Sequence, residues 1–191
     1  MPMLSVIIPT EGQDPPVVAT LAALVPGVTA GLIQDVVLVD RGETDTIARV
    51  ADIAGCGFLV CKGSRADALA AGVKETRAPW LMFLHPGTVP DQGWIDETAR
   101  FIDRMASAPV PRAAILRYAR SPYANHGLGA TVAHALRLLS GPSPDQGLVI
   151  ARRHFEVLGG YPAGRRDAER TLLRKLGPAR LMLRSRIMMP E

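Results

Sequence analysis

A regular alternation of short aliphatic runs with segments of helical periodicity constrains the fold more than any other feature of the chain. Buried-strand patterns occupy residues 4–8, 36–39, 58–60 and 80–84, and apolar residues at helical spacing follow each of them. This strand–helix order predicts an α/β fold with a doubly wound, mainly parallel sheet flanked by helices. Right-handed crossovers would place a ligand crevice at the carboxyl ends of the strands.

The second half of the chain is less regular but continues the same pattern. Strand patterns fall at residues 113–118 and 148–151, and helices are predicted near residues 128–139, 153–158 and 167–176. A length of 191 residues suits one α/β domain or two tightly fused halves. We therefore expect a single domain over residues 1–191.

Composition places the chain among globular proteins. It is 48% hydrophobic and 21% charged, which argues against disorder. Apolar runs fall short of the roughly 18 residues that a membrane span needs. The first residues enter a strand pattern without a basic leader, so we expect a cytoplasmic protein. The spacing of Cys56 and Cys61 fits neither a zinc pair nor a redox pair, and we expect free thiols.

Positive charge is concentrated in the C-terminal third. Residues 151–191 hold ten Arg or Lys against four acids, a net +6, whereas the whole chain carries +4 and residues 1–150 therefore carry −2. Such a segment can meet phosphates, an acidic partner or anionic lipid in a peripheral membrane contact. The alternative is a solvated basic face. The basic residues are not interleaved with aromatics, so we expect no nucleic-acid partner.

Polar or turn-forming residues close three of the predicted strands. The dipeptide Pro9-Thr10 follows the first strand, Asp40 follows the second, and His85-Pro86-Gly87 follows the fourth. If these strands are neighbours, their ends line one crevice. No phosphate-loop lysine motif, serine nucleophile elbow or zinc signature accompanies them.

Three of these stretches resemble the GT-A fold of family 2 glycosyltransferases. They are Leu-Ser-Val-Ile-Ile-Pro-Thr at residues 4–10, Val-Asp-Arg-Gly-Glu-Thr-Asp at residues 39–45, and residues 80–87 at the place of the family's Asp-x-Asp strand end. The order of Phe-Leu-His at 83–85, Asp-Gln-Gly at 145–147, Arg-Arg at 152–153 and Gly-Gly-Tyr at 159–161 is similar to the small bacterial subgroup called radical-SAM/selenodomain-associated transferase 2.

The resemblance implies transfer of a sugar from a nucleotide-diphosphate donor to an acceptor hydroxyl, with inversion. It implies a nucleotide-sugar-binding half at residues 1–90 and an acceptor-side half at residues 91–191. Pro9, Thr10 and Asp40 would frame the nucleotide, with Asp45 nearby. The alternatives are a turn residue for Asp40 and a helix N-cap for Asp45. The acceptor would be a small or lipid-linked molecule.

The chain departs from the family at the metal motif, which is degenerate. The metal-binding carboxylate should fall at Gly87, which has no side chain to ligate the Mg²⁺ or Mn²⁺ that the family resemblance implies. His85 alone does not hold a hard cation that prefers oxygen, so we assign no metal ligand. His85 can instead contact phosphate directly, with Arg65 as a second contact; the alternatives are a structural histidine and a solvated arginine.

A catalytic base is the third requirement, because the acceptor hydroxyl must lose a proton. Counting from the Gly-Gly turn, the family's Glu-Asp pair falls on Ala168 and Glu169. Glu169 precedes Leu172, Leu173 and Leu176 at helical spacing, which predicts an inward carboxylate. Asp167 is predicted to cap the helix. Glu169 is therefore the base candidate, with an ion pair to an arginine as the alternative.

Acceptor-side candidates are Asp145 and Gln146, which follow a Pro-rich turn and precede a strand. A turn-capping Asp145 is the alternative. The loss of the carboxylate at Gly87 also leaves open a second function: a glycosyltransferase-like protein that binds a nucleotide sugar or a partner without catalysis.

Overall fold

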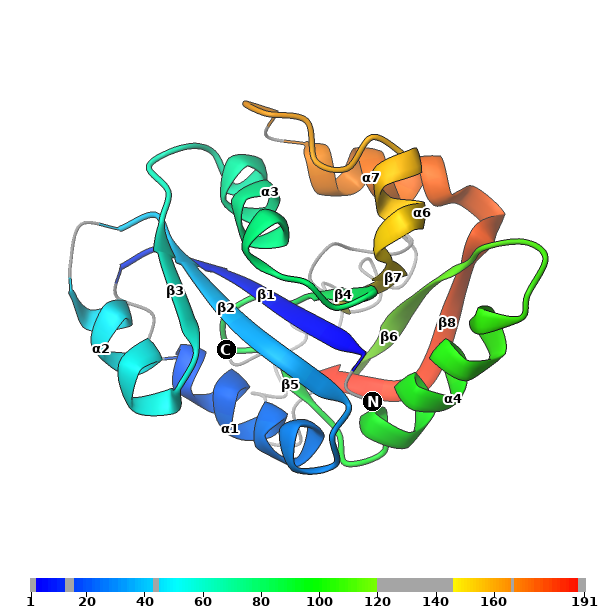
Figure 1. Cartoon of the computed structure of the whole chain (residues 1–191), viewed down its shortest axis with the longest axis horizontal. Helices are drawn as coiled ribbons and strands as arrows, with labels where there is room; N and C mark the ends of the chain where they lie inside the picture. The colour runs from blue at the N-terminus through cyan, green and yellow to red at the C-terminus, as the bar shows by residue number, and fades with distance from the viewer. Residues whose placement is uncertain (1–2, 13–15, 43–44, 120–145, 166, 189–191) are drawn as a thin grey trace, which may run out of the picture.

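A computed structural model describes residues 3–12, 16–42, 45–119, 146–165 and 167–188. These residues form an eight-stranded sheet with the order β3-β2-β1-β4-β7-β6-β8-β5 (Figure 1). The strands are β1 (Leu4–Thr10), β2 (Ile33–Asp40), β3 (Gly57–Val60), β4 (Trp80–Phe83), β5 (Val89–Pro90), β6 (Ala113–Ala119), β7 (Leu148–Ala151) and β8 (Arg180–Met188).

The sheet is mainly parallel, as the sequence predicts. Strands β3, β2, β1 and β4 pair in parallel, and so do β6 and β8. Strand β7 is antiparallel to both β4 and β6, so β6 runs in the same direction as β4. Strand β5 is antiparallel to β8. The carboxyl ends of β1, β2, β3, β4, β6 and β8 therefore meet at one edge of the sheet.

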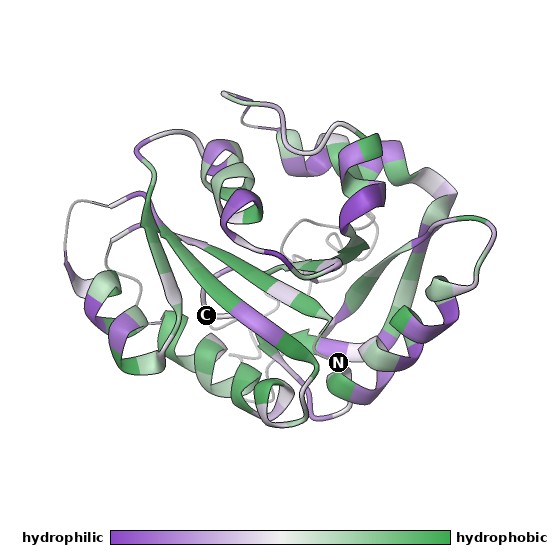
Figure 2. Ribbon diagram, in the orientation of Figure 1, coloured by the Kyte–Doolittle hydropathy of each residue, from purple (hydrophilic) through white to green (hydrophobic). Residues whose placement is uncertain are grey.

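Helices cover both faces of the sheet (Figure 1). One core cluster joins α1 (Pro16–Thr29), α2 (Thr46–Ala54) and α4 (Trp94–Ala106) to the sheet. A second cluster, on the other face, joins α3 (Arg65–Glu75), α6 (Arg152–Val157) and α7 (Ala168–Leu176). The central strands are apolar along their length because both of their faces are covered, and Figure 2 shows this hydrophobic centre.

The predicted strands 4–8, 36–40 and 80–84 are neighbours, since β2, β1 and β4 lie side by side. Helix α2 ends at a glycine C-cap, because Gly55 has φ 66° and its N–H bonds back into the helix. The helix predicted near residues 128–139 lies outside the described residues.

Two carboxylates of the α4 region hold β8 in place. Glu97 accepts hydrogen bonds from the backbone N–H groups of Arg184 and Ser185 at 2.7 and 2.6 Å. Asp91 accepts one from the Arg186 N–H at 2.9 Å. The N-cap position of α4 is Gly93, so the Asp91 side chain bonds β8 and does not cap the helix.

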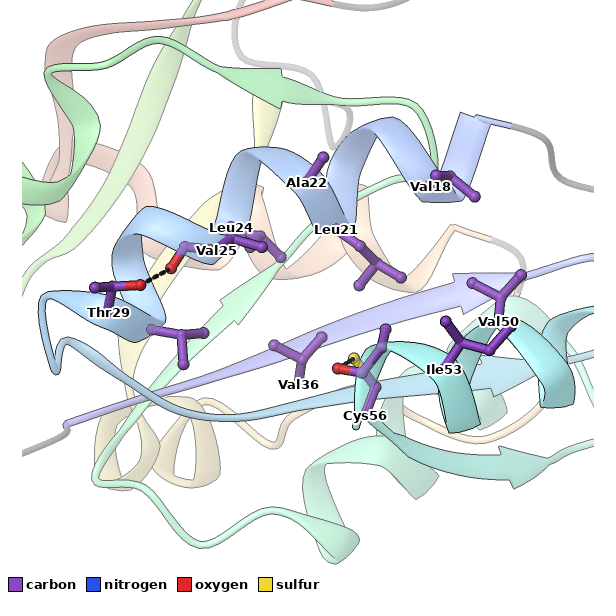
Figure 3. A pocket seen from close by; sticks show the side chains of 12 residues that line it. Val18, Leu21, Ala22, Leu24, Val25, Thr29, Val36, Val50, Ile53 and Cys56 are labelled. Carbon is purple, nitrogen blue, oxygen red and sulfur yellow. Dashed lines mark hydrogen bonds between the residues drawn. The ribbon is translucent and has the colours of Figure 1, made fainter.

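An open apolar groove of about 540 Å³ runs between α1 and α2 over β2 (Figure 3). Its lining side chains are aliphatic apart from Thr29 and Cys56, and the Thr29 hydroxyl donates to the Val25 carbonyl at 3.0 Å. None of the described helices is long and apolar enough to cross a membrane.

Candidate active site

A buried hydrogen-bonded pair joins the carboxyl ends of β1 and β2. Thr10 and Asp40 are partners in the parallel register, and both are almost fully buried. The Thr10 hydroxyl and the Gly12 N–H each donate to Asp40 Oδ1 at 2.8 Å. Asp40 therefore fixes the loop that follows β1. Pro9 lies buried in β1, one residue before Thr10.

The loops after β1, β2 and β3 are tied together at this edge. Arg41 forms an ion pair with Glu11 and donates from Nε to the Gly63 carbonyl at 3.2 Å. A Cβ atom at Gly42 would lie 2.2 Å from the Cα atom of Gly12, so the two loops pass too closely for any side chain there. This contact explains the glycine of the Val-Asp-x-Gly stretch.

A charged cluster lies at the carboxyl end of β4. Arg65 begins α3 and donates from Nε to Glu169 Oε2 at 2.9 Å. His85, two residues beyond β4, places Nε2 at 3.4 Å from Glu169 Oε1. All three side chains are at most one quarter exposed. We call Arg65, His85 and Glu169 the ionic cluster.

The helix α7 carries Glu169 to this position as its periodicity predicts. Leu172, Leu173 and Leu176 are buried in the core cluster beneath it. Asp167 lies on the exposed side and contacts Arg165, Thr171 and Arg174. It occupies the N-cap position of α7, but its side chain accepts no capping hydrogen bond, because the Thr171 hydroxyl and the arginines engage the carboxylate instead. Asp167 therefore stands at the predicted cap position, but the side-chain capping bond is absent.

The charge state of Glu169 follows from its neighbours. Burial by itself raises the pKa of a carboxylate, but the proximity of His85 and the positive charge of Arg65 outweigh burial, so the pKa of Glu169 lies below its ordinary value. The Nη2 atom of Arg65 is buried and makes no hydrogen bond to a described residue. The cluster thus combines an ionised carboxylate with a buried guanidinium donor that has no hydrogen-bond partner among the described residues.

Three aromatic side chains pack together next to the ionic cluster. Phe83, Phe155 and Tyr161 pack with ring centroids 5.0 to 5.4 Å apart. Burial, and then the negative charge of Glu169, raise the pKa of Tyr161 well above its ordinary value. Sequence reasoning used Tyr161 only as part of a motif and missed its contact with the site. The Gly-Gly turn before it was the available signal, because Gly160 has φ 56° and passes directly over the Phe155 ring.

Gly87 occupies a tight turn immediately after the ionic cluster. It has φ 86°, a conformation that side chains disfavour, and both the N–H and the hydroxyl of Thr88 donate to the His85 carbonyl, at 3.1 and 2.6 Å. Among the residues that the structure describes, no group of three or more His, Cys, Asp or Glu side chains is gathered to hold a metal ion. The guanidinium of Arg65 beside His85 and Glu169 also repels a divalent cation. The described residues at this edge do not fit the Mg²⁺ or Mn²⁺ that the resemblance implies.

The remaining residues predicted for the site are less closely associated with the ionic cluster. Asp45 stands exposed at the N-cap position of α2, without a side-chain capping bond. Gln146 is buried just before Gly147 and β7, whose start lies level with the end of β4. Asp145 lies outside the described residues.

Comparison with known proteins identifies the fold. No protein-family model and no curated protein sequence matches the chain. Solved glycosyltransferase structures do match over nearly its whole length. The structure of glucosyl-3-phosphoglycerate synthase from Mycobacterium tuberculosis, in complex with Mn²⁺, UDP and glucosyl-3-phosphoglycerate, has a TM-score of 0.65 at 16% identity, covering 98% of this chain and 71% of that one. The fold is of the GT-A glycosyltransferase type.

Two further structures share this GT-A fold. Mannosyl-3-phosphoglycerate synthase from Rubrobacter xylanophilus matches with a TM-score of 0.61 at 18% identity, over 94% of this chain and 64% of that one. TarS residues 1–349 from S. aureus, in complex with UDP-GlcNAc, matches with a TM-score of 0.62 at 12% identity, over 99% of this chain and 59% of that one. The chain therefore spans about three fifths of the length of these two proteins.

Proposed function

We propose that this protein is a glycosyltransferase that moves a sugar from a nucleotide-diphosphate donor to an acceptor hydroxyl, with inversion at the sugar carbon. The observation that carries the proposal is the ionic cluster of Arg65, His85 and Glu169 at the carboxyl edge of a GT-A-type sheet. The matched structures support it, because one is a glucosyl-3-phosphoglycerate synthase in complex with UDP and another, TarS, is in complex with UDP-GlcNAc.

The nucleotide would lie against the ends of β1 and β2. Asp40 and Thr10 hold the wall of this subsite through their 2.8 Å hydrogen bond, and Pro9 continues that wall. Asp45 would approach from the start of α2. The donor's diphosphate would then extend toward β4, where Arg65 and His85 stand.

Glu169 would act as the base. Its lowered pKa keeps the carboxylate ionised near neutral pH, and the contacts with Arg65 and His85 fix its orientation. In the transfer step the acceptor hydroxyl gives its proton to Glu169, and the acceptor oxygen forms the new bond to the sugar carbon. The bond from that carbon to the phosphate oxygen breaks, and its electron pair leaves with the nucleoside diphosphate.

Arg65 and His85 would stabilise the leaving diphosphate, on which negative charge develops in the transition state. The unpaired Nη2 donor of Arg65 supports this role, since a phosphate oxygen would satisfy it. Arg65 and His85 would then make the contacts to the diphosphate that a metal ion would otherwise make, and we propose weak or absent dependence on Mn²⁺.

A second function competes with catalysis. The turn at Gly87 has no side-chain ligand and a φ of 86°, which favours a protein that binds a nucleotide sugar, or a partner, without transferring the sugar. Under either function we propose family 2 and its small bacterial subgroup as the relatives, a cytoplasmic location, and no nucleic-acid partner. The acceptor would be small or lipid-linked, on a side built from residues 91–191 that includes Asp145 and Gln146.

A donor screen tests the proposal. A ligand at about 100 times its Kd stabilises the native state by about 2.7 kcal/mol, which in a chain of this size raises Tm by roughly 5–10 °C. Thermal melts with a panel of nucleotide sugars, each with Mn²⁺ and with EDTA, should reveal one or more donors. Release of nucleoside diphosphate with candidate acceptors then separates the transferase from the binder. A panel without any stabilising nucleotide sugar would contradict the transferase and the nucleotide-sugar binder alike, and would leave the partner-binding form of the second function.

A further inference from the structure

Two arginines face each other across β6 and β8 at the edge of the sheet that carries the ionic cluster. Arg117 and Arg186 are direct partners in the parallel register of these strands, which lie side by side in Figure 1. Both side chains are exposed. Neighbouring strands are about 4.8 Å apart, so the two guanidinium groups share one small region of surface.

The sheet register places these arginines on the same face as the ionic cluster. Phe83 of β4 pairs with Leu148 of β7, and Leu148 pairs with Ile115 of β6. All three are buried in the core cluster that α7 covers. Side chains alternate along a strand, so Arg117, two residues beyond Ile115, points to that same face. His85 stands two residues beyond Phe83, and two strand spacings, about 10 Å, separate β4 from β6.

Like charges directly opposite each other destabilise a sheet, and the registers of the other described strands hold no such pair. Within the described residues, neither the Arg117 nor the Arg186 guanidinium makes an ion pair or a hydrogen bond. Asp91 approaches Arg186 only to accept from its backbone N–H at 2.9 Å. Most other basic side chains of the C-terminal third have acceptors: Arg152 on Val73, Thr76 and Ala78, Arg165 and Arg174 on Asp167, Lys175 on Leu158, and Arg180 on Gly177.

We infer that Arg117 and Arg186 bind a phosphate monoester of the acceptor. Two adjacent guanidinium forks match the oxygens of one phosphate group and form charge-assisted hydrogen bonds with it. An acceptor anchored there would lie within about 10 Å of His85 and Glu169, which lets its hydroxyl reach the base. This assignment rests on the proposed glycosyl transfer for its role, but the anion site itself does not require catalysis.

The test uses the full chain and glycerol 3-phosphate as the probe, with glycerol as the uncharged control. Calorimetry should show saturable binding of glycerol 3-phosphate but not of glycerol. R117Q and R186Q should each weaken it about tenfold, because each removes a charged hydrogen-bonding group. R184Q is the matched control, since Arg184 is equally exposed on β8 but lies beside Glu97. It should bind like the wild type.

Two further measurements are needed. One distinguishes loss of binding from loss of folding, and the other distinguishes a soluble phosphate from a lipid headgroup. Without ligand, R117Q and R186Q should melt at or slightly above the wild-type Tm, because each relieves a repulsion; a large fall in Tm would contradict the unpaired arrangement. Phosphatidylcholine vesicles with and without phosphatidic acid form the lipid arm. Vesicle binding that requires both arginines, without binding of glycerol 3-phosphate, would assign the same site to a lipid headgroup.

The inference is overturned if R117Q and R186Q bind both phosphate sources as the wild type does, or if R184Q loses as much affinity. UDP binding by calorimetry is measured in parallel and should be unchanged in all three variants. A wild type that binds glycerol 3-phosphate but no nucleotide would retain the anion site and refute the glycosyl-transfer proposal alone.

Discussion

Arg65 and Glu169 stand 104 positions apart in the sequence, yet the Arg65 Nε atom lies 2.9 Å from Glu169 Oε2. The contact joins the first turn of α3 to the first turn of α7 over the carboxyl end of β4. It converts a glutamate at the start of a helix into a fixed, ionised carboxylate next to His85. Two of the predictions that follow depend on this pair.

Replacing Glu169 by Gln should abolish most turnover while leaving donor binding nearly intact. The amide keeps the shape of the side chain but cannot take the acceptor proton, and loss of a general base typically lowers kcat by about 10²–10⁴-fold. Steady-state kinetics and UDP calorimetry on the same preparation make the comparison. D167N is the control, because Asp167 is exposed and faces away from the core. If D167N lost activity and E169Q did not, the base would be misassigned.

Replacing Arg65 by Met should make the free energy of unfolding vary less with pH in the acid range. The folded pKa of Glu169 is depressed, so this residue contributes stability above its unfolded pKa of about 4.3, and the contribution is lost as pH falls through the lower folded value. R65M should raise that folded pKa and reduce stability near pH 7 by about 1–2 kcal/mol, after allowing for partial exposure.

Denaturant melts of R65M and the wild type between neutral and strongly acid pH test the direction of this pH dependence. The two curves should converge at low pH, where Glu169 is protonated in both proteins. R170M is the matched control, since Arg170 is an exposed arginine one residue from Glu169. If the free energy of unfolding differed between R65M and the wild type by the same amount at every pH, Arg65 would stabilise the fold by packing alone.

Donor binding should be insensitive to divalent metal. Gly87 offers no ligand, and Arg65 already supplies positive charge beside His85. Calorimetry of UDP binding in Mn²⁺ and in EDTA should give similar affinities. Micromolar Mn²⁺ binding that H85A removes would show that another set of ligands has replaced the missing carboxylate.

Replacing Asp40 by Ala should cost about 2–3 kcal/mol and abolish nucleotide binding. The substitution leaves the buried Thr10 hydroxyl and the Gly12 N–H without their shared acceptor. Asp35 is the control, because it lies on the same strand but one of its buried carboxylate oxygens makes no hydrogen bond to a described residue. D35A should therefore be close to neutral in stability and should bind nucleotide normally.

Arg152 should prove structural, although it belongs to the Arg-Arg motif. Its guanidinium donates to the carbonyls of Ala78 and Val73 at 2.9 Å and to the Thr76 hydroxyl at 3.0 Å. R152M should lower stability by about 2–4 kcal/mol, because these partly buried acceptors lose their donors. R153M alters the exposed neighbour and should change little. Equal effects in urea melts would remove the distinction between the two arginines.

Local sequence patterns were sufficient to predict the positions of most strands and helices and the direction in which Glu169 points. The predicted strands at 4–8, 36–39, 58–60 and 80–84 overlap β1 to β4, and α7 presents Leu172 and Leu176 to the core as the periodicity predicts. These features could be predicted because burying one face of a helix or strand makes apolar residues recur at that element's own spacing. The spacing is the same whichever segment packs against the face.

Which charged groups contact one another depends instead on how the elements pack. The pairing of Arg65 with Glu169, and that of Arg117 with Arg186, depend on strand order and register. The register between β6 and β8 shifts between Ile115 and Arg117, so no count along the chain would have aligned the two arginines. Local periodicity reports that a side chain is buried, whereas its partner depends on how distant segments close on one another.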